Sequence, residues 1–270
     1  MAELRVGIGG LGAIGLAVAK KLDDGGLPGL TLTAVSAARV AAAQERLQGF
    51  TRPPPVLPLE ALAAEADVLV ECAPAAVFDS LAEPAVEAGR SLLVLSAGAL
   101  LTRPALIDKA AQTGARLLVP SGAMLGLDAI RAAAEGEIQS VTIITRKPPT
   151  GLQGAPYLVQ QGIDLSGLAE PRQVFAGPVS AAALAFPANL NVAAAVALAG
   201  IGPERTQSEV WADPSLTRNT HRVEVVSDSS DFTMTIAGRP SLENPRTGLL
   251  TPLSVIAALR RLTDPLVVGT

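Results

Sequence analysis

Several residue types are scarce in this 270-residue chain, and each shortage narrows the possible functions. Cys72 is the only cysteine, so an internal disulfide is excluded and a reducing, cytoplasmic environment is expected. His221 is the only histidine, and one cysteine with one histidine cannot form a typical zinc site, so no metal is expected. Aromatic residues make up 3%, the net charge is −4 and there is no basic tract, so no nucleic-acid partner is expected.

Long hydrophobic runs are also missing. The most apolar stretch, residues 181–200, contains Pro187, Asn189 and Asn191, and it therefore indicates a buried helix rather than a membrane span. The first predicted strand begins almost at Met1, so no signal peptide is expected. With 49% hydrophobic and 17% charged residues, the chain has a globular composition and enough length for two lobes.

A glycine motif near the start of the chain organises the rest. Residues 4–8 are mostly apolar and predict a strand, residues 16–22 predict a helix, and Gly10-Leu11-Gly12-Ala13-Ile14-Gly15 lies between them. This is the dinucleotide fingerprint in its strand-turn-helix context, in which the helix N-terminus receives the phosphates. The alternative is a glycine-rich turn without a ligand. The predicted cofactor-binding residues here are Gly10, Gly12, Ala13, Ile14 and Gly15.

The end of the second predicted strand, residues 30–36, bears on the choice of cofactor. An acidic residue at this place would bind the ribose 2′-hydroxyl of NAD. The chain has Ser36 and then Arg39 instead, which better suits the 2′-phosphate of NADP. The alternative is that Arg39 is only a solvated helix residue. The predicted cofactor is therefore NAD or NADP.

Strands and helices alternate from residue 4 to residue 119, which predicts an α/β fold with a Rossmann-type, doubly wound parallel sheet over residues 1–123. Cys72 and Ala73 follow the buried strand 66–71, and ligands of such sheets bind at the carboxyl ends of the strands. Both residues are therefore predicted to lie near the cofactor.

The pattern changes after residue 123. Predicted strands at 140–146, 174–180, 206–212, 221–226 and 231–236 are grouped with few helices, so residues 124–247 are predicted to form a second α+β lobe with an open mixed sheet. This lobe is expected to carry the substrate and dimerisation surfaces. The closing helix, within about 248–270, is expected to pack back on the first lobe.

Few residues of the second lobe offer chemistry. His221 can exchange protons near neutral pH, although a single histidine is more often structural. Arg146 and Lys147 form a pair of cations that could hold a dicarboxylate, or could be a solvated strand end. Asn189 and Asn191 stand at a predicted helix start, where each could cap the helix or orient a nicotinamide carboxamide.

Several stretches together resemble the L-aspartate dehydrogenase family over nearly the full length. The matching stretches are the glycine motif, Glu71-Cys72-Ala73, residues 96–100, Ser121-Gly122-Ala123, Arg146-Lys147-Pro148, residues 189–194, residues 198–200, Ala212-Asp213-Pro214, Asn219-Thr220-His221 and Asn244-Pro245-Arg246-Thr247. Two departures stand out. Met124-Leu125-Gly126 replaces the family's usual isoleucine and glycine after Ser121-Gly122-Ala123, and residues 37–39 lack an acid.

The resemblance implies a reversible, NAD(P)-dependent oxidative deamination of L-aspartate to iminosuccinate, which hydrolyses to oxaloacetate and ammonia. It also implies that His221 is the active-site histidine, that Ala123 and Asn191 contact the nicotinamide, and that the protein is a homodimer. Two alternatives are a dehydrogenase of another small dicarboxylate or semialdehyde, and a non-catalytic NADP(H) sensor. The candidate substrate-binding residues are Arg146, Lys147, Ser121, Asn189 and Thr220.

Overall fold

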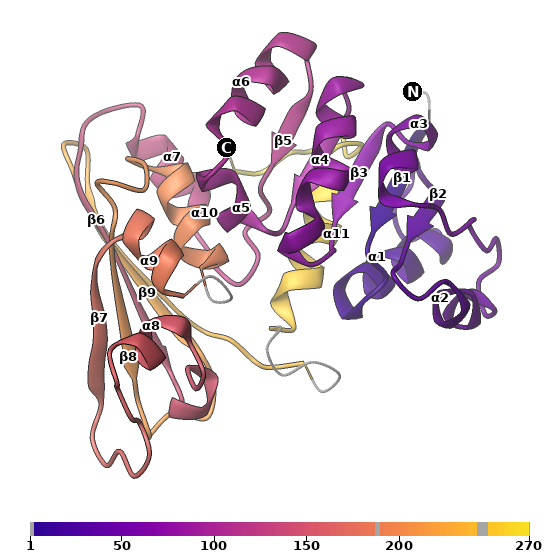
Figure 1. Ribbon diagram of the computed structural model, residues 1–270. Helices are drawn as coiled ribbons and strands as arrows, with labels where there is room; N and C mark the ends of the chain where they lie inside the picture. The colour runs from indigo at the N-terminus through magenta and orange to yellow at the C-terminus, as the bar shows by residue number, and fades with distance from the viewer. Residues whose placement is uncertain (1–2, 187–189, 242–247, 270) are drawn as a thin grey trace. The chain divides into compact units, whose positions relative to one another are not determined.

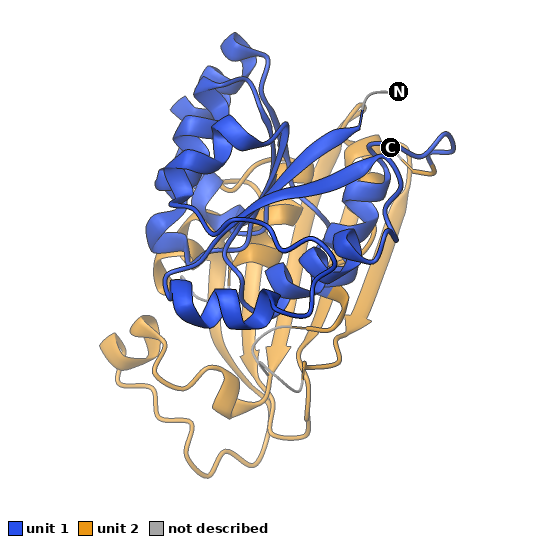
Figure 2. Ribbon diagram, turned by 90° about the vertical axis from the view of Figure 1, so that its right-hand side faces the viewer, with its two compact units in different colours: residues 1–122, 251–267 blue, residues 123–250, 268–270 orange. Residues whose placement is uncertain are grey.

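The computed structural model describes residues 3–186, 190–241 and 248–269. The chain forms two compact units, which Figure 2 colours separately. Unit 1 contains residues 1–122 and 251–267, and unit 2 contains residues 123–250 and 268–270.

Unit 1 is built on a five-stranded parallel sheet with the strand order β2-β1-β3-β4-β5. The predicted doubly wound parallel sheet is confirmed. Its central strands are apolar on both faces, and Val6, Ile8, Leu69 and Val70 are fully buried, as expected for parallel strands covered by helices. The strands are β1 (Leu4–Gly9), β2 (Leu30–Ser36), β3 (Val68–Glu71), β4 (Ser91–Val94) and β5 (Arg116–Leu118).

The helices of unit 1 follow the strands in turn (Figure 1). Pro104 occupies the first position of α6, where its missing N–H costs nothing, and Gly114 ends that helix in a left-handed conformation with φ 76°. The helices are α1 (Ala13–Asp23), α2 (Val40–Leu47), α3 (Leu62–Glu65), α4 (Phe78–Glu87), α5 (Ala97–Leu101) and α6 (Pro104–Thr113), with the 3-10 turns η1 (Leu59–Ala61) and η2 (Ala75–Val77).

The last helix, α11 (Leu250–Arg260), contributes to the core of unit 1. Val255 and Leu259 are fully buried in the same cluster as Val6 and Ile8. The Arg260 guanidinium also donates a 2.7 Å hydrogen bond to the carbonyl oxygen of Gly26. Two segments from opposite ends of the sequence thus share one core.

Unit 2 carries a second five-stranded sheet, with the order β10-β9-β6-β8-β7. The central strand β6 pairs parallel with β8 and antiparallel with β9, so the predicted mixed sheet is confirmed. The strands are β6 (Ile138–Lys147), β7 (Arg172–Pro178), β8 (Gln207–Ala212), β9 (Thr220–Ser227) and β10 (Asp231–Ala237).

Helices lie against one face of this sheet, which we call the inner face (Figure 1). Val141, Ile143, Val223 and Val225 point to it and are buried, whereas the residues between them are more exposed. The predicted helix 187–198 is present as α10 from Asn191, and its predicted first residues, 187–189, lie outside the described residues. The remaining elements are α7 (Leu127–Ala133), η3 (Pro149–Gly151), α8 (Pro156–Gln160), α9 (Val179–Ala185) and α10 (Asn191–Ala199).

None of the helices within the described residues is both long enough and apolar enough to cross a membrane.

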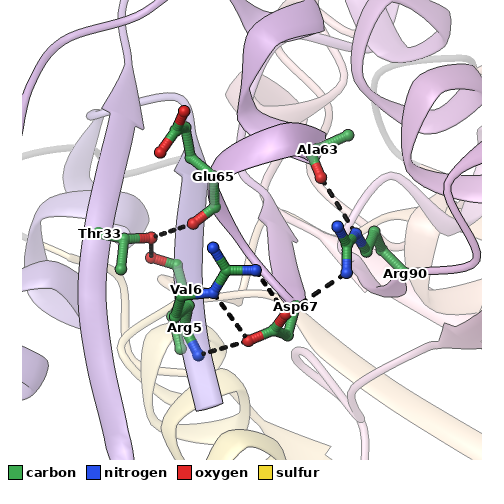
Figure 3. A network of polar contacts seen from close by, with 7 residues as sticks. All are labelled: Arg5, Val6, Thr33, Ala63, Glu65, Asp67 and Arg90. Atoms are coloured by element: carbon green, nitrogen blue, oxygen red, sulfur yellow. Dashed lines mark hydrogen bonds and ion pairs between the residues drawn. The ribbon is translucent and has the colours of Figure 1, made fainter. Parts of the chain in front are cut away.

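A polar network stabilises the amino-terminal edge of the sheet in unit 1 (Figure 3). Asp67, just before β3, accepts hydrogen bonds from the backbone N–H and the guanidinium of Arg5, at 3.1 and 2.8 Å. Arg90, just before β4, contacts the same carboxylate at 3.4 Å and donates to the Ala63 carbonyl. The Thr33 hydroxyl donates to the carbonyl of Glu65. The network thus ties the starts of β1, β3 and β4 together and connects β2 and β4 to α3.

We expect Asp67→Asn to lower the midpoint of thermal unfolding by a few degrees at most, because partly exposed ion pairs contribute little. The Arg5 guanidinium holds the pKa of Asp67 below its usual range. The stability that the ionised Asp67 carboxylate contributes is therefore present at pH 7 and is lost as the pH falls through the folded-state pKa of Asp67. The difference between the two proteins should shrink as the pH is lowered from about 5 to 3, measured by circular dichroism. An unchanged difference at low pH would contradict this account.

Candidate functional site

The glycine loop joins β1 to α1 at the carboxyl edge of the sheet in unit 1. Gly10 has φ +105°, a conformation that L side chains rarely adopt, and its N–H donates to the carbonyl oxygen of Ser36 at 2.9 Å. Gly12 precedes the first residue of α1, Ala13, and no side chain caps that helix. The N–H groups of its first turn lack partners within the helix, and they can therefore bind an anion.

Each glycine of the motif meets different surroundings. A Cβ on Gly15 would lie 1.9 Å from the carbonyl oxygen of Gly10, and a Cβ on Gly10 would lie 2.6 Å from the carbonyl oxygen of Cys72. A Cβ on Gly12 would meet no heavy atom of the described chain within 4 Å. Gly10 and Gly15 thus allow the chain to pack on itself, while Gly12 faces open space. This is the pattern that a dinucleotide pyrophosphate requires.

The strand order places a topological switch point between β1 and β3, where ligands of such sheets bind. Gly9 of β1 is in register with Glu71 of β3, and the N–H of Cys72 donates to the Gly9 carbonyl at 2.8 Å. The predicted residues Cys72 and Ala73 therefore lie beside Gly10. Burial raises the pKa of the Cys72 thiol, which favours its protonated form.

Glu71 is a buried acid beside the glycine loop to which the sequence analysis gave no role. Its side chain is fully buried and accepts hydrogen bonds from the N–H groups of Leu95 and Ser96, at 3.1 and 2.7 Å, and from the Ser96 hydroxyl. Burial raises the pKa of this carboxyl, and the donors oppose that shift. Glu71 thereby holds the turn between β4 and α5 at the edge where the cofactor is expected. The sequence did contain a sign of this role, because Glu71 is an acidic residue at the end of an otherwise apolar strand.

The two residues predicted to decide between NAD and NADP lie in different environments. Ser36 is buried, and its carbonyl contacts the glycine loop. Arg39 is exposed and directly precedes α2. A second arginine was missed: Arg46, on the last turn of α2, donates a 2.8 Å hydrogen bond to the Leu11 carbonyl inside the glycine loop.

The segment Ser121-Gly122-Ala123 spans the boundary between the units. Within unit 1, the N–H of Gly122 donates to the Ser254 hydroxyl at 3.1 Å. Ser121 and Ala123 are half-buried. Met124, one of the departures from the family pattern, is buried at 1% exposure and so packs inside rather than facing solvent.

A buried polar cluster lies on the inner face of the sheet in unit 2. Thr145 of β6 and His221 of β9 are cross-strand partners, with 3.0 Å between Thr145 Oγ1 and His221 Nδ1. Lys147 is two residues further along β6 and therefore points to the same face. The three side chains are only 5 to 7% exposed. We refer to Thr145, Lys147 and His221 as the inner-face cluster.

The charges of the inner-face cluster follow from its burial. Burial lowers the pKa of Lys147 to about 8. Burial and the nearby positive charge of Lys147 lower the pKa of His221 to about 4. At pH 7 the imidazole is therefore neutral and the lysine still carries its proton.

Two other predicted substrate-binding residues, Arg146 and Thr220, lie on the opposite face of the sheet from this cluster. Adjacent strand residues point to opposite faces, so Arg146 and Lys147 cannot act as one pair. Arg146 lies on the outer face, where it contacts Asp213 at 3.4 Å and stacks over the Trp211 ring at 4.7 Å. Thr220 is its cross-strand partner there. Asn191 is exposed as the first residue of α10, whereas Asn189 and residues 244–247 lie outside the described chain.

Comparison with known proteins identifies the family. Residues 10–120 match the family model of the homoserine dehydrogenase NAD-binding domain, and residues 128–262 match that of the aspartate dehydrogenase C-terminal domain. An L-aspartate dehydrogenase of Bordetella bronchiseptica is 51% identical over 99% of this chain and 98% of its own length. The chain belongs to the aspartate dehydrogenase family. A relative of the same name from Bradyrhizobium diazoefficiens is 52% identical over 99% of this chain and 95% of its own length.

Solved structures agree with this fold. The aspartate dehydrogenase of Thermotoga maritima matches 98% of this chain and 99% of its own, with a TM-score of 0.72 at 23% identity. Membership of this dehydrogenase family and the NAD-binding domain make the chain an oxidoreductase with NAD or NADP as its cofactor. The expected fold and cofactor are thus confirmed.

Proposed function

We propose that this protein catalyses the reversible, NAD(P)-dependent oxidative deamination of L-aspartate to iminosuccinate, which hydrolyses to oxaloacetate and ammonia. The observation that carries the proposal is the inner-face cluster, which puts a neutral imidazole and a buried ammonium side by side in the part of the chain that matches the aspartate dehydrogenase C-terminal domain. An imidazole can exchange a proton with the substrate, and an ammonium can hold a carboxylate.

The residues of unit 1 are assigned to the cofactor. When bound, the cofactor would supply a hydride acceptor for Cα of aspartate. Gly10, Gly12 and the first-turn N–H groups of Ala13, Ile14 and Gly15 would hold the pyrophosphate. Ser36 and Arg39 would meet the adenosine ribose, and Cys72 with Ala73 would line the switch point. The open space at Gly12 and the uncapped start of α1 support this assignment.

The residues around the substrate complete the proposal. His221 would serve as the proton-exchanging group, acting on the amine or on the water that attacks the imine. Lys147 would hold a substrate carboxylate, since it shares the inner face with His221 while Arg146 and Thr220 do not. Ser121 and Asn189 would contribute further substrate contacts, and Ala123 and Asn191 would contact the nicotinamide. We also propose a cytoplasmic homodimer.

The test is absorbance at the reduced-nicotinamide band, with purified protein and L-aspartate in separate reactions with NAD and NADP. We expect reduction with L-aspartate and none with D-aspartate or L-malate. The ratio of the two rates, compared with that of Arg39→Ala, measures the contribution of Arg39 to the cofactor choice. No reduction in either reaction, together with no amination of oxaloacetate, would overturn the proposal. Activity on another dicarboxylate, or tight NADPH binding without turnover, would establish one of the alternatives.

The role of Lys147 predicts a pH dependence. Succinate has two carboxylates and no amine, so its inhibition of aspartate oxidation reports on carboxylate binding alone. If the ammonium of Lys147 binds it, the inhibition constant should be nearly constant between about pH 6.5 and 7, where both carboxylates of succinate are charged, and rise about tenfold per pH unit above the pKa of about 8. Lys147→Met should bind succinate weakly and equally at every pH. A wild-type constant that stays flat to pH 9.5 would exclude Lys147 from this role.

A further inference from the structure

The hydrogen bond between Thr145 and His221 joins two side chains that are both buried. Thr145 is 7% exposed and His221 is 5% exposed, and 3.0 Å separates Oγ1 from Nδ1. Their neighbours on the same strand faces are Ile143 and Val223, which are apolar and fully buried, and Lys147. Both groups are therefore largely removed from solvent, and leaving either without its partner is costly.

The donors and acceptors of this pair can be counted. A threonine hydroxyl offers one donor, and a neutral imidazole offers one donor nitrogen and one acceptor nitrogen. Among the residues that the structure describes, Nδ1 of His221 is the one hydrogen-bond partner of the Thr145 side chain. If Nδ1 carried the proton, the hydroxyl hydrogen would be buried without an acceptor, which is costly. If the hydroxyl donates to Nδ1, the hydroxyl hydrogen and the Nδ1 lone pair satisfy each other.

We propose that Thr145 is a positioning residue whose hydroxyl donates to Nδ1 of His221 and thereby holds the neutral ring in the tautomer that carries its proton on Nε2. The low pKa of His221, about 4, supports a neutral ring at pH 7. The ring then presents an N–H donor at Nε2. The proposed function left open whether His221 gives or accepts a proton. The tautomer makes His221 a hydrogen-bond donor in the resting protein.

The tautomer has a consequence for the reaction, and this consequence rests on the proposed function. As ammonia adds to the ketone of oxaloacetate, a C–N bond forms and the carbonyl electron pair moves to oxygen. The Nε2–H of His221 would donate a hydrogen bond to that oxygen without giving up its proton. A neutral imidazole can stabilise negative charge on a carbonyl oxygen in this way.

The experiment uses the fact that His221 is the only histidine of the chain. Protein produced without a histidine tag and labelled with ¹⁵N-histidine gives ring resonances from this one residue, and the two nitrogen shifts report the tautomer. At pH 7 and without ligands, we expect a pyridine-type Nδ1 and a pyrrole-type Nε2. Thr145→Ser keeps the hydroxyl and should give the same spectrum. Thr145→Val removes it at nearly constant shape, and the two shifts should move toward each other.

Kinetics provide a second readout. Thr145→Val should lower kcat about tenfold with little change in the KM for the cofactor, and Thr145→Ser should restore most of kcat. A wild-type spectrum with the proton on Nδ1, or a Thr145→Val spectrum identical to that of wild type, would overturn the proposal. The wild-type spectrum decides the tautomer even if the valine variant fails to fold. Because the spectrum needs no substrate, a silent aspartate assay would overturn the proposed function alone.

Discussion

Replacing His221 by alanine is expected to slow L-aspartate oxidation by about 10²–10³-fold, the range that one positioned hydrogen-bond donor to a developing negative charge contributes. His221 is nearly buried and hydrogen-bonded to Thr145, so its ring is held in one orientation. The affinity for NADPH should change little, because the glycine loop is in the other unit. The measurements are initial rates with saturating L-aspartate and cofactor binding by fluorescence titration.

A cavity in unit 2 could also slow turnover, and a matched variant separates the two causes. Val223 lies two residues after His221 on β9, points to the same face and is fully buried. Val223→Ala should lower the melting temperature and keep kcat within a few-fold of wild type. His221→Ala with wild-type turnover would remove His221 from the mechanism. An equal loss of kcat in both variants would assign the effect to packing.

The second large effect is expected at the glycine loop, where the same change at two positions should have different results. Gly12→Ala should preserve the fold, because its Cβ would meet no described heavy atom within 4 Å. The added methyl group would, however, occupy the space through which the pyrophosphate approaches the backbone. We expect the melting temperature to be unchanged and the Kd for NADPH to rise by about 100-fold or more.

Gly15→Ala should act in the opposite manner. Its Cβ would lie 1.9 Å from the Gly10 carbonyl oxygen, which is backbone and cannot rotate away. Helix α1 would have to move off β1, so the melting temperature should fall markedly and the yield of folded protein should drop. Thermal unfolding and NADPH titration of both variants provide the comparison. If Gly12→Ala binds NADPH as wild type does, the glycine loop does not hold the pyrophosphate as proposed.

The sequence was most informative where the signal is local. The strand, the glycine loop and the helix occupy residues 4–23 without interruption, and their spacing alone predicts β1, the turn and α1. The parallel strands were predictable for the same reason, since each is a short stretch rich in apolar residues. The bounds were less accurate: Ala66 and Asp67 were assigned to the third strand, but Asp67 serves the polar network and β3 begins at Val68.

The candidate site was harder to predict because its contacts are long-range. Thr145 and His221 meet because β6 and β9 pair in one register, and nothing near either residue in the sequence reveals that register. Glu71 and Ser96 meet across neighbouring strands in the same manner. The placement of Arg146 and Lys147 on opposite faces of the sheet could, however, have been predicted, because successive side chains of any strand point to opposite faces.

The position of α11 in the core of unit 1 has a consequence for synthesis of the protein. During synthesis, residues 4–118, which contain all five strands of the parallel sheet, emerge from the ribosome long before Val255 and Leu259. At about 5–20 residues per second, the nascent sheet waits several seconds for the helix that completes its core. Over that interval Val6 and Ile8 lack their partners from α11, so the nascent chain is most prone to aggregation, and to capture by chaperones, before its last residues emerge.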